Sequence, residues 1–285
     1  MPTRRIRQFV PAVRTLEGAG VVVHRTIGTP RLRHLDPFLM LDQFRSDDPE
    51  QYIAGFPDHP HRGFVTLTYM IDGHMLHRDS MGNRGDLRSG GVQWMKAASG
   101  VIHSEMPQQT AGLMRGFQLW INLPAAEKMS DPEYRNYEPE RIPVVEGDGE
   151  RVKVIAGAYR DARGPVRDPH TDVVYLDVAL AGGRELRHTL PAEYSAFVYL
   201  FEGEADVAGA KLPNDSLAVL DEGDGVEVRA GTAGARFLLV AGRPLGEPIV
   251  QYGPFVMNRP EEIREAIEDY NNDRLVRRRA RIVSD

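Results

Sequence analysis

The stretch GFVTLTYMIDGHMLHRDSMG, residues 63–82, decides the fold class of this 285-residue chain. β-Branched and aromatic residues fill its first half, and the turn signal Asp72-Gly73 precedes a polar return segment, which predicts a β-hairpin. Similar apolar runs with glycine or aspartate–glycine corners recur along the whole chain. They cover residues 20–28, 116–124, 152–159, 173–180, 195–207, 216–228 and 235–242. Short strands at this spacing are typical of β-barrels or sandwiches, not of alternating strand–helix units.

Two segments depart from this strand pattern. Residues 124–143 are polar, contain four prolines and carry charges of both signs, so we expect a linker or crossing between two halves. Residues 258–270 predict one helix, with Pro260 in the first turn and glutamates at the positive end of the helix dipole. Its apolar face follows helical spacing at Ile263, Ala266, Ile267 and Tyr270.

Composition excludes several classes of protein. The net charge of −6 argues against electrostatic nucleic-acid binding, and the absence of cysteine excludes disulfides, thiolate zinc sites and a cysteine nucleophile. No apolar run is long enough to span a membrane, and the N-terminus lacks the apolar core of a secretory signal, so we expect a cytoplasmic protein. The basic residues near the C-terminus fit a solvated end better than a phosphate-binding surface.

Two short pairs of metal-binding residue types raise the question of function. FPDHPHRGF, residues 56–64, places His59 and His61 two apart, and GVIHSEMP, residues 100–107, does the same with His103 and Glu105. Residues i and i+2 of a strand share a face, so the four side chains converge if their strands face each other across a narrow barrel. Pro60 suits an edge strand, where no ladder hydrogen bond is lost. Surface turns remain the alternative for both pairs.

The donor set points to a kind of metal. Imidazole and carboxylate ligands suit a divalent transition metal, whereas a closed zinc site usually takes thiolates. His77 and Asp79 follow the first pair, and they either line the same cavity, support a metal ligand, or belong to an ordinary exposed hairpin.

The chain resembles the pirin family of the cupin superfamily in an ordered set of motifs between Gly18 and Tyr270: LDPFLMLDQF, GFPDHPHRGF, GDLRSGGVQWMKAASGVIHSEMP, GFQLWINLP and GRPLGEPIVQYGPFVMN. The resemblance implies an all-β bicupin, with two tandem cupin barrels of the double-stranded β-helix (jelly-roll) type and a short C-terminal helix. We expect an N-terminal metal-binding barrel at residues 1–130 and a linker at 131–143. A metal-free barrel with the helix and a basic tail would then occupy residues 144–285.

The resemblance also implies a set of metal ligands, namely His59, His61, His103 and Glu105. Iron(II) is the expected ion, and nickel, copper, manganese, cobalt and zinc are compatible with the same donors. The second half offers only the isolated His170 and His188, in line with a metal-free barrel. One departure is Val65, where pirins commonly have glutamate. That glutamate is not a ligand, so the metal site should survive.

Some pirins act similarly to quercetinases, which open the flavonol ring with dioxygen and release carbon monoxide. On this interpretation the substrates are a flavonol such as quercetin and dioxygen. Glu105 is the candidate catalytic base, with pure coordination as its alternative role. The candidate substrate-binding residues are Phe56, His77, Trp94, Met106 and Phe117, although residues of this kind also fill any barrel core.

A different class of function competes with the dioxygenase. Pirins also act as regulatory proteins in which the iron shapes a surface that binds an enzyme or a transcription factor, and the basic residues Arg274 to Arg281 fit such a contact. A sugar- or small-acid-metabolising cupin is a third alternative. None of the three requires a membrane or direct contact with nucleic acid.

Overall fold

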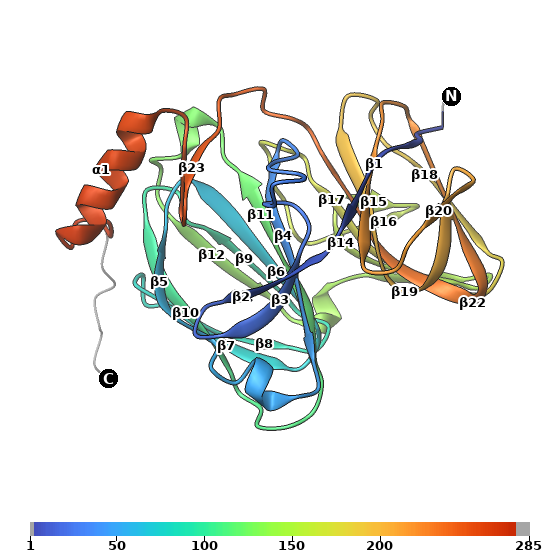
Figure 1. The fold of residues 1–285 in the computed structure, drawn as a ribbon, viewed down its shortest axis with the longest axis horizontal. Coiled ribbons are helices and arrows are strands. Elements are labelled where there is room, and N and C mark those ends of the chain that lie inside the picture. The colour runs from blue at the N-terminus through green and yellow to red at the C-terminus, as the bar shows by residue number, and fades with distance from the viewer. Residues whose placement is uncertain (1–2, 278–285) are drawn as a thin grey trace. The chain divides into compact units, whose positions relative to one another are not determined.

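The computed structural model describes residues 3–277, which form two compact units. Within these residues, unit 1 comprises 3–13, 28–37 and 140–244, and unit 2 comprises 14–27, 38–139 and 245–277. Strands dominate both units, and the single α-helix of the described residues lies in unit 2 (Figure 1). The all-β prediction is confirmed.

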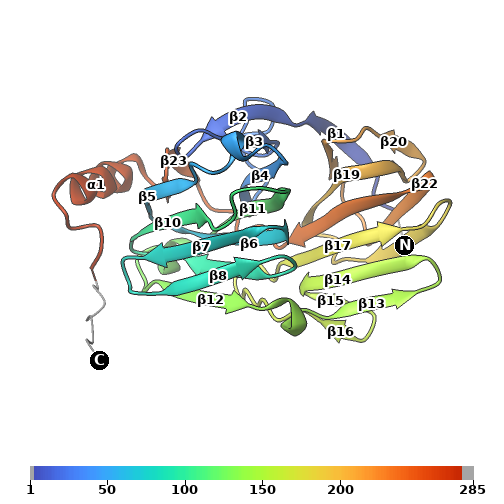
Figure 2. The ribbon, with the colours of Figure 1, turned by 90° about the horizontal axis from the view of Figure 1, so that it is seen from below.

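Unit 2 consists of two main sheets and a small hairpin. Its strands are β2 (Val13–Glu17), β3 (Val21–Arg25), β4 (Phe38–Ser46), β5 (Phe56–His61), β6 (Phe64–Asp72), β7 (His74–Asp79), β8 (Arg84–Arg88), β9 (Val92–Lys96), β10 (Val101–Pro107), β11 (Met114–Asn122), β12 (Glu133–Tyr137), β23 (Val250–Tyr252) and β24 (Phe255–Met257). The larger sheet has the order β12-β9-β6-β11-β4-β3-β2, and the smaller has the order β5-β10-β7-β8. Figure 2 shows the strands of the smaller sheet side by side.

The segment that predicts a hairpin forms a corner instead. β6 pairs with β9 and β11 in the larger sheet, whereas β7 pairs with β8 and β10 in the smaller one. The hairpin prediction is therefore wrong, although both strands and the turn exist. Gly73 has φ +115°, and a Cβ there would lie 2.8 Å from Oε1 of Gln109, so the corner requires glycine.

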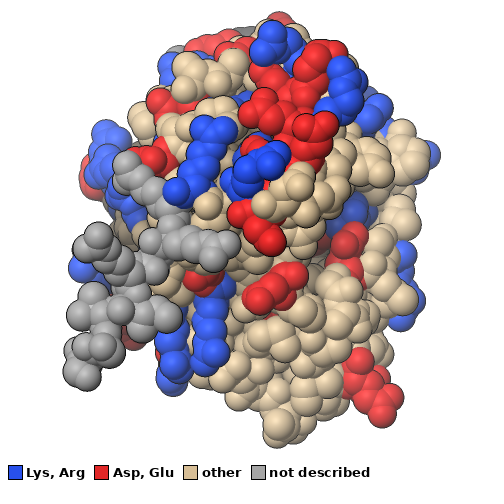
Figure 3. Space-filling model, turned by 90° about the vertical axis from the view of Figure 1, so that its left-hand side faces the viewer, with Lys and Arg blue, Asp and Glu red and all other residues tan. Residues whose placement is uncertain are grey.

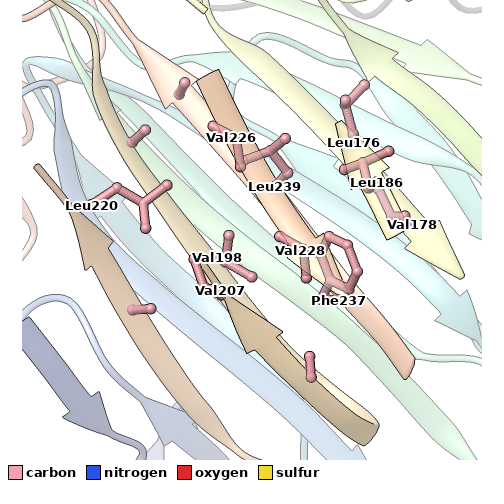
Figure 4. Close-up of a cluster of buried hydrophobic side chains, with 14 of the residues drawn as sticks. Leu176, Val178, Leu186, Val198, Val207, Leu220, Val226, Val228, Phe237 and Leu239 are labelled. Carbon is pink, nitrogen blue, oxygen red and sulfur yellow. The ribbon is translucent and has the colours of Figure 1, made fainter. Parts of the chain in front are cut away.

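Unit 1 is built around one large antiparallel sheet. Its strands are β1 (Ile6–Pro11), β13 (Val144–Gly147), β14 (Glu150–Ala156), β15 (Ala158–Tyr159), β16 (Ala162–Arg163), β17 (Val174–Leu180), β18 (Glu185–Thr189), β19 (Ser195–Val207), β20 (Ala210–Leu212), β21 (Ser216–Leu220) and β22 (Gly225–Gly242). The main path runs β1-β21-β19-β22-β17-β14-β13. The inward faces of these strands meet in an apolar core that contains Val198, Phe237 and Leu239 (Figure 4).

The first strand of the chain belongs to unit 1. β1 pairs with β21, and the buried guanidinium of Arg4 donates to the carbonyl oxygens of Pro191, Tyr194 and Asp221. The basic start of the chain is therefore partly a buried anchor. This division differs from the sequence-based boundaries, which place residues 1–130 in a single N-terminal barrel.

The segment expected as a linker carries a strand. β12 pairs with β9 along five residues and forms one edge of the larger sheet of unit 2. Two short 3-10 helices, Ala125–Glu127 and Pro139–Arg141, flank β12, and a third, Pro49–Gln51, follows β4. Prolines and mixed charges thus mark an edge strand with turns at both ends.

The predicted helix is confirmed as α1 (Pro260–Asn271), and it belongs to unit 2 and not to the second barrel. Its buried Ile263 and Ala266 pack on Phe255 and Met257 of β24. Figure 3 views the side of the molecule that carries α1, and it shows acidic and basic side chains near one another there. No helix within residues 3–277 is long and apolar enough to cross a membrane. The expected basic contact surface runs from Arg274 to Arg281, and the part of it beyond Arg277 lies outside the described residues.

We expect truncation of the unit 1 core to destabilise the protein. Leu239→Ala removes a fully buried side chain and should cost about 2–5 kcal/mol of unfolding free energy, because lost burial and the residual cavity add. Val144→Ala on the exposed edge strand β13 is the control and should change stability by less than about 0.5 kcal/mol. Urea denaturation followed by circular dichroism measures both, and equal effects would contradict the assigned core.

Candidate metal centre

Strand pairing brings the three predicted histidine ligands together. β5 and β10 are antiparallel neighbours, with His59 directly opposite His103, and His61 lies on the same face two residues further along β5. One ring nitrogen from each of the three histidines lies within 4.8 Å of those of the other two. The two strands are thus neighbours in one sheet. The sequence-based expectation, in which they face each other across the barrel, is wrong. β5 is the edge strand, as Pro60 predicts.

The inner two histidines, His61 and His103, are buried, and each has at least one ring nitrogen without a hydrogen-bond partner in the described part of the chain. Within residues 3–277, no group hydrogen-bonds to Nε2 of His103, and neither ring nitrogen of His61 makes a hydrogen bond of normal geometry, although the carbonyl of Pro254 lies nearby. Burial lowers the pKa of both imidazoles, and the neighbouring histidines lower it further. Neutral, convergent imidazoles with free nitrogens fit a divalent metal ion.

A hydrogen-bonded chain sets the tautomer of His103. Nε2 of His77 donates to the carboxylate of Asp79 at 3.1 Å, and Nδ1 of His77 lies 3.3 Å from Nδ1 of His103. With a neutral His77 ring, His103 donates through Nδ1 and keeps its lone pair on Nε2, the unpartnered atom. Asn83 and the backbone amide of Met81 fix the Asp79 carboxylate in turn. His77 therefore supports a candidate ligand.

A local contact likewise leaves Nε2 of the outer histidine, His59, free to bind a metal ion. Its Nδ1 donates to the carbonyl oxygen of Pro57 at 2.7 Å, which leaves Nε2 as the free nitrogen. His59 is half-buried, so the cluster opens to solvent on this side.

The carboxylate of Glu105 lies apart from the histidine cluster. Glu105 is buried on β10 two residues after His103, and it lines the same pocket as His59 and His61. Its Oε2 accepts from Nε2 of Gln118 at 2.8 Å, and its Oε1 accepts from Oγ1 of Thr68 at 3.3 Å. Both carboxylate oxygens thus have protein partners.

A pocket of about 540 Å³ opens over the histidines. Its walls include Glu105 and residues from the larger sheet, from β23 and from the turn that follows it, namely Arg25, Met40, Asp42, Gln118, Trp120, Gln251, Gly253 and Pro254. Arg25 donates twice to the Asp42 carboxylate, at 2.7 and 2.6 Å. No motif in the sequence links this ion pair to the histidines. The sequence does indicate that Gln118 and Trp120 share a face, because side chains alternate between the two faces of the strand predicted at residues 116–124.

Only one of the five expected substrate-binding residues lines this pocket. Phe56 does so, whereas His77 lies behind His103. Phe117 alternates with the pocket residues Gln118 and Trp120, so it lies on the opposite face of β11. Trp94 pairs with Leu67 and Met106 with Leu76, and neither is among the lining residues.

The valine that departs from the pirin pattern lies away from the cluster. Val65 is buried on β6 and alternates with Thr66, on the face opposite to the one that Thr68 presents to Glu105. The substitution therefore leaves the arrangement of the four candidate ligands untouched.

Comparison with known proteins agrees with this architecture. The pirin family matches residues 20–121, and the pirin C-terminal cupin domain matches residues 175–276. A Pseudomonas aeruginosa protein named "Putative quercetin 2,3-dioxygenase" is 50% identical over 90% of this chain and 92% of its own length. A pirin-like protein from Caulobacter vibrioides is 46% identical over 96% of this chain and all of its own.

Solved structures show the same fold. The crystal structure of a quercetin 2,3-dioxygenase from Acinetobacter baumannii matches with a TM-score of 0.90 at 33% identity, covering 96% of this chain and 99% of that one. The two units are therefore cupin barrels, and a chain that joins two of them is a bicupin. This chain belongs to the pirin family.

The buried histidines predict how the metal-free protein responds to pH. Their pKa values are lowered in the native state, so below about pH 6.5 the unfolded chain binds protons that the native protein does not. Stability should therefore fall as the pH decreases from about 7 to 5.5, by up to about 1.4 kcal/mol per pH unit for each histidine. Urea titrations across this range measure the slope. It should be shallower in the double variant His61→Asn/His103→Gln, and an unchanged slope would contradict the assignment.

Proposed function

We propose that His59, His61 and His103, with Glu105 as a fourth ligand, bind a divalent transition metal, iron(II) before others. The supporting observation is that three imidazoles converge and that, among the described residues, Nε2 of His103 and both ring nitrogens of His61 lack protein hydrogen-bond partners. Nickel, copper, manganese, cobalt and zinc accept the same donors. In this arrangement Glu105 must turn from Gln118 and Thr68 toward the histidines.

We further propose that this centre serves a dioxygenase that cleaves flavonols such as quercetin. The Pseudomonas relative is named "Putative quercetin 2,3-dioxygenase", and the similar Acinetobacter structure is that of a quercetin 2,3-dioxygenase. The pocket volume also falls in the usual range for small-molecule sites. When bound, the metal ion supplies open coordination positions and lowers the pKa of a bound hydroxyl.

The residues of the chain divide the remaining tasks. Trp120 stacks on Phe64 and meets the His61 ring edge-on, with the centroids of the Trp120 and His61 rings 5.1 Å apart. A planar substrate beside His61 would therefore meet an apolar wall that excludes water. Phe56 adds apolar surface next to His59. Glu105 is the candidate base that takes the hydroxyl proton on a carboxylate oxygen.

Turnover of quercetin tests this function. Iron-loaded protein should remove the quercetin absorbance band under air and release carbon monoxide, and His61→Ala should abolish both because it removes a buried ligand. Metal analysis of untagged protein accompanies the assay. If fully loaded protein leaves quercetin unchanged over hours, the dioxygenase assignment is wrong, and the regulatory alternative, with its protein partner, becomes the better interpretation.

The support chain behind His103 should matter for metal binding. Asp79→Asn weakens the hold on His77 and should lower metal affinity by roughly 10–100-fold, as for other partners of metal ligands. Asp86→Asn is the matched control, since Asp86 also pairs with a histidine, His74, but on the surface. Competition with a chromogenic chelator measures both affinities. Equal affinities for the two variants would rule out the support role.

A further inference from the structure

A one-directional hydrogen-bond chain leads from the pocket wall to Glu105. Nε1 of Trp120 donates to Oε1 of Gln118 at 3.1 Å. Indole nitrogen can only donate, so the amide oxygen of Gln118 must face Trp120 and its NH₂ group must face Glu105. A flipped amide would set donor against donor at Trp120 and oxygen against carboxylate at Glu105, so the chain fixes the orientation.

The same amide group also orients the second donor. Nε2 of Gln118 lies 3.2 Å from Oγ1 of Thr68, whose hydroxyl accepts this bond and has its single proton left for Oε1 of Glu105. Gln118 and Thr68 are directly opposed on β11 and β6, so the sheet register itself presents the two donors as a pair. Thr68 and Glu105 are 2% and 3% exposed, so water does not compete well for these bonds.

These contacts orient the Glu105 carboxylate toward the larger sheet. Three histidines converge within 4.8 Å, and the carboxylate of Glu105 is not part of that group. The donors that hold it away are polar side chains on the larger sheet, whereas the histidines come from the smaller sheet. Glu105 therefore lies between two competing sets of partners on opposite sheets of one barrel.

We propose that Gln118 is a positioning residue that competes with the metal for Glu105, with Trp120 holding its amide in the competing orientation. The inference rests on the metal centre of the proposed function and adds a second state for its fourth ligand. A carboxylate shared in this way binds the ion less tightly than a dedicated ligand, and it remains available to accept a proton. Because Trp120 also lines the pocket, an occupant of the pocket touches the first member of the chain.

Metal affinity tests the competition without reference to turnover. Gln118→Met removes the amide donor and keeps about the size of the side chain, so that Thr68 alone holds the carboxylate and Glu105 should turn more readily to the histidines. We expect metal-depleted Gln118→Met protein to bind Co²⁺ roughly tenfold more tightly than the wild type, because the hydrogen bond from Gln118 to the charged carboxylate no longer has to be broken. The visible absorption of bound Co²⁺ should change as well, because the ligand set changes.

Three controls separate positioning from a structural role. In a Glu105→Gln background, Gln118→Met should leave Co²⁺ affinity unchanged. Gln93→Met removes another buried glutamine, whose amide donates to the carbonyl of Gly85, and should leave affinity at the wild-type value. Trp120→Phe removes the N–H that orients Gln118 while it keeps an aromatic ring next to Phe64, and it should tighten Co²⁺ binding by a smaller factor. This variant tests the inference if Gln118→Met fails to fold.

The outcomes distinguish this inference from the proposed function. Unchanged or weaker binding in Gln118→Met and Trp120→Phe, or equal tightening with and without Glu105, overturns the positioning role while the metal centre stands. Failure of the wild type to bind any divalent metal overturns both. Tighter binding that depends on Glu105, in a protein that leaves quercetin untouched, supports the positioning role and removes only the dioxygenase.

Discussion

The antiparallel pairing of β5 with β10 is the constraint on which the candidate metal centre depends. It places His59 opposite His103 and leaves His61 on the same face. A slip of one residue would turn every side chain of one strand to the other face and disperse the cluster. Arg62, which directly follows β5, holds the end of this strand in place. Its guanidinium donates to the carboxylate of Asp269 in α1 and to the carbonyl oxygen of Ser99.

The corner at Gly73 is what allows both sheets of unit 2 to serve the site. It carries the chain from β6 to β7, so one short segment supplies Thr68 to Glu105 from the larger sheet and His77 to His103 from the smaller one. A paired hairpin would have placed both residues in one sheet. Glu105 and Nδ1 of His103 thus find hydrogen-bond partners inside this barrel, whereas Nε2 of His103 and both ring nitrogens of His61 find none among the residues that the structure describes.

Unit 1 shows what a cupin barrel becomes without such partners. Its interior is a continuous set of valine, leucine, alanine and aromatic side chains, as Figure 4 shows around Val228 and Phe237. Burying a lone histidine or carboxylate there would cost several kcal/mol without a compensating bond. Within residues 3–277, the cluster of three candidate ligands occurs in unit 2 alone.

Local patterns alone determined much of this protein: the strands, the helix, the face that Gln118 and Trp120 share, and the two pairs of candidate ligands. Only the tertiary structure decided that β6 and β7 part at Gly73, that β1 joins unit 1, and that the Glu105 carboxylate accepts hydrogen bonds from Gln118 and Thr68. The same limit separates Phe56, which lines the pocket, from Trp94, Met106 and Phe117. The physical reason is that alternation along a strand encodes which face a side chain takes, whereas the neighbour it meets depends on pairing between segments far apart in sequence.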